Sequence, residues 1–222
     1  MKLEMMTHKA SSAVAMDAAP ARLPGRPRSE EARKSILKAA YRLLRKSGVE
    51  GVSTHHIAEE AGVSTATLYR WWDTKEAILL DAYVEHHREQ WPYPKTGSPL
   101  ARLRQHAIRT TQFLKSEDGR VFLRLIMAIQ EDTALRAALF EKLYLPRRAE
   151  ARAVVEEAIS MGELPPTTKI DLLIEFIHAP QFRRLFIGND QLDEDFAVQV
   201  FDFAIAAATS TAAPRGRQGG TH

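Results

Sequence analysis

The feature that most restricts the fold of this chain is the segment 53–72, which reads STHHIAEEAGVSTATLYRWW. Ser53 and Ser64 are residues suited to cap a helix, and each stands directly before a short helical pattern. Gly62 lies between the two patterns and suits a tight turn, while Leu68 points toward a small core. Two short helices joined by such a turn predict a helix-turn-helix unit.

The second of these helices has the composition of a DNA-reading helix. In a helix-turn-helix it lies in the major groove, with the residues at its N-terminal end against base edges. Thr65 and Ala66 are small enough to allow close approach, and Thr65 and Thr67 offer hydroxyl or methyl groups to bases. Tyr69 and Arg70 extend toward phosphates, which orient the helix without reading sequence.

Two further helices complete the predicted N-terminal domain. A helical pattern covers about 30–46, with Ser29 as its cap and Gly48 after its end. Asp73 or Thr74 begins another helix that runs to about residue 90, and Asp73 and Glu76 have the spacing of a capping box. Lys75 is unfavourably placed at the positive end of this helix, a mismatch that a nearby phosphate would offset.

Charge is distributed unevenly along the chain, although the formal net charge is only +3. Between residues 22 and 46 there are nine cations and only two acids, Glu30 and Glu31. The cations are Arg22, Arg26, Arg28, Arg33, Lys34, Lys38, Arg42, Arg45 and Lys46. This asymmetry indicates an N-terminal part that faces a polyanion, with a solvated helix face as the alternative reading.

The whole chain reads as an all-α protein of about nine or ten helices, with almost no strand signal. Further helices are predicted over about 100–115, 119–131, 133–144, 147–161, 169–187 and 193–209, with one break at Pro146. The expected organisation is a disordered extension over 1–24, a helix-turn-helix domain over 25–75, a connecting helix over 74–90, a second domain over 91–209 and a flexible tail over 210–222.

Several classes of protein and site are excluded. The chain has no cysteine, no apolar run of signal-peptide or membrane-spanning type, and no recognisable catalytic motif. A metal site at His86 and His87 is rejected because adjacent helix positions diverge by about 100°. We therefore expect a cytoplasmic protein that is not an enzyme, with no cofactor, no metal and no membrane partner.

The segment 57–80, IAEEAGVSTATLYRWWDTKEAILL, resembles the DNA-binding signature of the TetR family of transcriptional repressors. The resemblance implies an all-helical homodimer with an effector pocket in its C-terminal domain, which releases DNA when a ligand binds. Carried over by position, the recognition-helix contacts are Ser64, Thr65, Ala66, Thr67, Tyr69 and Arg70. The resemblance also implies that Ser53 and Lys75 contact the DNA backbone. Arg26 and Arg28 resemble the basic arm that precedes the first helix. The chain departs from the family pattern at His55, His56, Thr65, Ala66, Trp71 and Trp72.

Two features of the C-terminal half bear on regulation. The segment 108–131 has more apolar side chains than one buried helix face needs. They form part of the core or, alternatively, an effector cavity lined by Phe113, Phe122, Met127 and His178. The last two helices carry enough apolar surface for a four-helix dimer interface. Its expected residues are Phe176, Ile177, Leu185, Phe186, Phe196, Val200 and Phe203.

The predicted function is that of a ligand-responsive repressor. It would bind a palindromic operator in double-stranded DNA as a homodimer, and a small hydrophobic molecule would release it. Dimerisation matters because the two reading heads must lie about 34–36 Å apart. The alternative is a DNA-binding or nucleoid-type interaction protein with the same helix-turn-helix and no small-molecule effector.

Overall fold

The structure is a computed structural model that describes residues 29–88, 92–188 and 191–210. Arg26, Arg28, the predicted extension over 1–24 and the tail after residue 210 therefore lie outside the described residues. Every regular element in the described ranges is helical, which confirms the all-α prediction. No helix in these ranges is long and apolar enough to cross a membrane.

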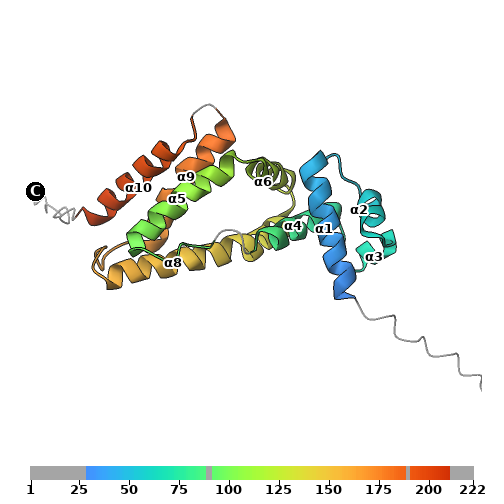
Figure 1. The fold of residues 1–222 in the computed structure, drawn as a ribbon, viewed down its shortest axis with the longest axis horizontal. Helices are drawn as coiled ribbons and strands as arrows, with labels where there is room; N and C mark the ends of the chain where they lie inside the picture. Colours follow the sequence, from blue (N-terminus) through green and yellow to red (C-terminus); the bar gives the residue numbers. More distant parts are fainter. Residues whose placement is uncertain (1–28, 89–91, 189–190, 211–222) are drawn as a thin grey trace, which may run out of the picture.

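Four helices form the N-terminal head and its connection to the rest of the chain, on the right of Figure 1. They are α1 (Glu30–Ser47), α2 (Thr54–Ala61), α3 (Thr65–Tyr69) and α4 (Lys75–His87). Each begins where a hydroxyl side chain accepts a backbone N–H, and the four caps are Ser29, Ser53, Ser64 and Thr74. The capping box expected at Asp73 is wrong, because the Thr74 hydroxyl accepts the N–H of Ala77 at 3.1 Å instead.

The remaining helices make up the C-terminal part of the chain. They are α5 (Pro99–Lys115), α6 (Glu117–Ala128), α7 (Thr133–Leu139), a π-helical segment η1 (Phe140–Tyr144), α8 (Leu145–Ser160), α9 (Ile170–Ile187) and α10 (Glu194–Thr209). Of these, α5, α8, α9 and α10 form an elongated bundle on the left of Figure 1. Helices α5, α9 and α10 pack side by side, and α8 runs along the opposite side of α5 (Figure 1).

The predicted break at Pro146 is wrong, because the helix continues through it. Proline lacks an N–H and its ring collides with the carbonyl of the residue four positions earlier. The chain accommodates Pro146 with the wider π turn, in which the N–H of Leu145 reaches back five residues to the carbonyl of Phe140. As a result α7, η1 and α8 form one continuous rod.

The rod connects two separate groups of buried apolar side chains. The first, called here the head cluster, joins α1–α4 to α6 and contains Leu44, Leu68, Trp72, Leu79 and Leu125 among others. The second, called here the C-terminal cluster, joins α5, α8, α9 and α10. Leu139 and Leu143 of the rod pack against the head cluster, whereas Val154 and Val155 lie within the C-terminal cluster.

Candidate nucleic-acid interface

The turn between α2 and α3 depends on a left-handed residue, Gly62, with φ 68° and ψ 34°. The N–H of Gly62 donates to the carbonyl of Glu59, and that of Val63 donates to the carbonyl of Ala58 at 3.0 Å. These bonds satisfy the last carbonyls of α2, as in a Schellman cap. A Cβ at Gly62 would meet no atom within 4 Å, so the requirement for glycine comes from the backbone angles alone.

Helix α3 buries one face and presents the other. Leu68 is fully buried in the head cluster and anchors the helix. Ser64, Ala66, Tyr69 and Arg70 are exposed, and Thr65 and Thr67 are half-buried. The six residues predicted to contact DNA along this helix therefore all retain accessible surface.

Hydrogen bonds hold the exposed face of α3 in place. The Ser64 hydroxyl accepts the N–H of Thr67 at 3.3 Å and lies 3.0 Å from the Thr67 hydroxyl. Tyr69, although 53% exposed, has its hydroxyl 3.3 Å from that of Thr54 at the start of α2. The role of Thr54 was not expected from the sequence, where a threonine after the Ser53 cap has no distinguishing signal.

Ser53 and Lys75 have structural partners of their own. Ser53 is half-buried and caps α2 by accepting the N–H of His56 at 3.2 Å. The ammonium of Lys75 donates to the carbonyl of Val49 at 3.0 Å and lies 3.6 Å from the carboxylate of Glu76. These contacts offset the unfavourable position of Lys75 at the start of α4, so a phosphate is not needed to explain it.

The two tryptophans that follow α3 differ in environment. Trp72 is only 7% exposed and belongs to the head cluster, as its size suggests. Its indole N–H donates to Asp81 Oδ2 at 2.9 Å. Trp71 is half-buried, and the guanidinium of Arg33 lies 5.9 Å from its ring centroid. Neither Asp81 nor Arg33 was expected to contact this segment.

The geometry described above is that of a helix-turn-helix head with an accessible recognition helix, and two family models match successive parts of the chain. The model of bacterial regulatory proteins of the tetR family matches residues 36–82, and that of the tetracyclin repressor-like C-terminal domain matches residues 93–204. The chain belongs to the TetR family. It is a TetR-type transcriptional regulator and not an enzyme.

Known relatives of this TetR-family regulator agree with the assignment. It is 36% identical over 189 residues to the HTH-type transcriptional regulator YdeS of Bacillus subtilis, an alignment that covers 85% of this chain and 96% of YdeS. The TetR family transcription regulator SCO0332 has a similar structure, with a TM-score of 0.70 and 28% identity over 79% of this chain and 97% of that one. FadR of Bacillus subtilis, solved with stearoyl-CoA, is 16% identical with a TM-score of 0.56 over 78% of this chain and 97% of FadR, which shows a shared fold.

Of the four residues predicted to line an effector cavity, Phe122 lies in the head cluster, Phe113 packs against that cluster, and His178 lies on α9 beside His106. The ring centroids of Phe113 and Phe122 are 6.0 Å apart, and Phe182 lies 6.4 Å from Phe122. His178 is half-buried and lies about one helical turn before Phe182 on α9. The structure does not bring Met127 to this group, because Met127 is 59% exposed on the outer face of α6.

The histidines of this region are kept neutral. The ring centroids of His178 and His106 are 5.6 Å apart. The ring of His106 stacks on that of Tyr93, with 3.9 Å between their centroids. Burial lowers the pKa of His178 to about 4. Burial, aided by repulsion from a charged His178 and from nearby Arg147 and Arg109, lowers the pKa of His106 to about 3. Near neutral pH the region therefore offers uncharged imidazoles beside aromatic rings.

The residues predicted for the dimer interface divide into three groups. Phe176, Phe186 and Phe203 are exposed, and Phe203 most strongly at 70%. Leu185, Phe196 and Val200 are half-buried. The prediction for Ile177 is wrong, because this side chain is buried in the C-terminal cluster of its own chain. Exposed Leu172 and Ile187 extend the apolar face of α9 and were not in the predicted set.

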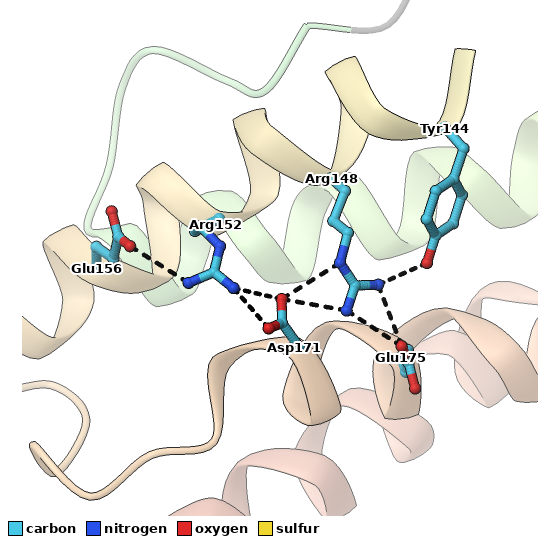
Figure 2. A network of polar contacts seen from close by, with 6 residues as sticks. All are labelled: Tyr144, Arg148, Arg152, Glu156, Asp171 and Glu175. Carbon is cyan, nitrogen blue, oxygen red and sulfur yellow. Dashed lines mark hydrogen bonds and ion pairs between the residues drawn. The ribbon is translucent and has the colours of Figure 1, made fainter. Parts of the chain in front are cut away.

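A network of charges fastens the start of α9 to α8, as Figure 2 shows. Arg152 Nη2 donates to both carboxylate oxygens of Asp171, at 2.5 and 2.6 Å. Arg148 donates to Asp171 at 3.2 Å and to Glu175 at 3.1 Å, and its guanidinium also bonds the Tyr144 hydroxyl. We call Tyr144, Arg148, Arg152, Asp171 and Glu175 together the α8–α9 clamp. It holds the helix that carries Phe176 in a defined orientation.

Proposed function

We propose that this protein is a homodimeric, ligand-responsive repressor that binds a palindromic operator. The observation that supports DNA binding best is the outer face of α3, which is accessible and yet held by hydrogen bonds at both ends. Pre-ordered side chains lose little entropy on binding. In this proposal Ser64, Thr65, Ala66 and Thr67 meet base edges, and Tyr69 and Arg70 meet phosphates. Arg26, Arg28, Ser53 and Lys75 are the further contacts to the DNA backbone.

The proposed dimer is supported by apolar surface that a single chain leaves exposed. Phe176 and Phe186 on α9 and Phe203 on α10 belong to neighbouring helices that pack together. Large exposed apolar patches mark interaction sites in soluble proteins. Two such helices from each chain would make an isologous four-helix interface and hold two heads at a fixed separation.

The proposed effector is a small hydrophobic molecule. Aromatic Phe113 and Phe122 and the neutral imidazole of His178 supply the mixture of apolar surface and few polar groups that small-molecule sites use. The molecule would act by binding more tightly to a conformation in which the heads no longer match the operator. Since its target is chromosomal DNA, we place the protein in the cytoplasm.

Selection of bound fragments from random DNA, followed by footprinting, tests DNA recognition. The proposal expects an enriched inverted repeat and protection of two half-sites about one helical turn apart. Uniform binding without an enriched sequence, with a steep dependence on salt, would favour the nucleoid-type alternative. The selected fragments then serve to screen fatty acids, acyl-CoA esters including stearoyl-CoA, and aromatic compounds for release of the protein from DNA.

Two substitutions test the contact residues. Tyr69→Ala and Thr67→Ala should each weaken binding to the selected operator about 5- to 150-fold, because a good contact to a base or phosphate is worth about 1–3 kcal/mol. Met161→Ala is a control, since Met161 is also a large exposed side chain but lies at the end of α8, away from the head and from η1. Operator affinity equal to wild type in both head variants, with unchanged circular dichroism, would refute these contacts.

A further inference from the structure

A hydrogen-bonded path joins the end of the recognition helix to the C-terminal half of the chain. Trp72, which follows α3, donates its indole N–H to Asp81 Oδ2 on α4 at 2.9 Å. The other oxygen of Asp81 accepts from the ammonium of Lys142, at 2.5 Å, on the π-helical segment η1. The end of the recognition helix, α4 and a segment 61 positions beyond Asp81 thus meet at one carboxylate.

Asp81 depends on these partners because it is largely covered. Its side chain is 14% exposed, and within the described part of the chain it accepts hydrogen bonds from Trp72 and Lys142. A buried carboxylate without partners is unfavourable. Asp81 and Lys142 line a surface groove together with three other cations, each of which has another contact. Arg88 pairs with Glu85 at 3.1 Å, Arg147 pairs with Glu150 at 3.3 Å, and Arg33 lies over the ring of Trp71.

The location of Lys142 makes it a link between the two halves of the molecule. Leu139 and Leu143, which flank it in the rod, pack against the head cluster, while the rod continues as α8 into the C-terminal cluster. The π turn that contains Lys142 therefore lies where the rod passes from one cluster to the other. Such turns are rare and are often found at functional positions.

We propose that Lys142 is a positioning residue for the recognition helix. It holds Asp81, Asp81 holds Trp72, and Trp72 fixes the C-terminal end of α3 and its junction with α4. Lys142 itself is 47% exposed and its ammonium contacts Asp81 on α4, so it acts on α3 through the other two side chains. Loss of its ammonium should make local unfolding of α3 more frequent, while the protein as a whole stays folded.

Hydrogen–deuterium exchange of the full chain, without DNA, tests the proposal. Lys142→Met removes the ammonium and keeps an apolar stem, and residues 65–80 should then exchange about 2- to 30-fold faster, the range expected for coupling through such a path. Lys142→Arg should restore slow exchange. The matched control is Arg152→Met, which breaks the bond to Asp171 in the α8–α9 clamp (Figure 2) and should leave residues 65–80 unchanged.

A second substitution keeps the test decisive. Asp81→Asn retains an acceptor for the Trp72 indole but loses the charge that attracts Lys142, so it should reproduce the faster exchange. The double variant Lys142→Met/Asp81→Asn should exchange no faster than either single variant. Wild-type exchange at residues 65–80 in both single variants, or equal acceleration in Arg152→Met, overturns the proposal. Because no DNA is present, its failure is distinct from a failure to find an operator.

Discussion

Two internal histidines, His106 and His178, should make the stability of this protein depend on pH. Burial lowers their pKa values to about 3 and about 4, whereas a histidine in an unfolded chain titrates near 6.5. As the pH falls below about 6.5 the unfolded chain takes up protons that the folded chain does not. Stability is therefore complete above that pH and is lost progressively toward pH 4 and below.

The size of the effect follows from these pKa values. Each histidine lowers the free energy of unfolding by about 1.4 kcal/mol for every pH unit below about 6.5. At pH 5 the free energy of unfolding is therefore lower by roughly 2 kcal/mol per histidine. The pair together accounts for about 4 kcal/mol, a large part of the 5–15 kcal/mol typical of a folded domain. His87 acts in the same direction, because burial also lowers its pKa.

Urea unfolding at pH 7.5 and pH 5.0, at one fixed protein concentration, measures this loss. The variant His106→Phe keeps a ring for Tyr93 to stack on, and its loss between the two pH values should be about 2 kcal/mol smaller than that of the wild type. His55→Gln, at an exposed position, is the control and should behave as wild type. The reasoning is refuted if His106→Phe loses as much stability as the wild type, or if NMR titration places the imidazoles of folded His106 and His178 near 6.5.

The remaining predictions concern the turn and the dimer. Gly62→Ala should lower the free energy of unfolding by about 1–2 kcal/mol in urea titrations, since a left-handed backbone strains a residue with a Cβ even where that Cβ touches nothing. An unchanged midpoint would show that the turn relaxes without cost. If the proposed dimer forms, Phe203→Glu should convert it to a monomer in sedimentation experiments, while Met127→Glu, a substitution at another exposed apolar side chain, should not. A dimer of wild-type strength in Phe203→Glu would place the interface elsewhere.

The head shows how much local sequence can predict. Ser29, Ser53 and Ser64 were identified as caps because a cap hydroxyl bonds a backbone N–H only three residues along the chain. Gly62 and Leu68 were placed correctly for the same reason: a left-handed turn and a helical period are properties of a few consecutive residues. The family resemblance in residues 57–80 rests on this same short segment.

Predictions that depended on which face of a helix is buried were less accurate. Ile177 is as apolar as its neighbour Phe176, yet Ile177 faces the core of its own chain and Phe176 faces outward. Met127 likewise has the composition of a cavity residue but lies outside. The expected break at Pro146 failed because the cost of a proline inside a helix is relieved by a π turn that the sequence does not announce.

The sequence alone determined the helix-turn-helix head, its caps and its accessible reading helix, since each depends on interactions over three to five residues. Only the tertiary structure decided which residues from distant parts of the chain contact one another. Asp81 and Lys142 are 61 positions apart, and buried Thr111 donates to Gln181 over 70 positions at 2.8 Å. Such pairs form only after the intervening chain has packed, because their free energy must exceed the entropy lost on closing a long loop.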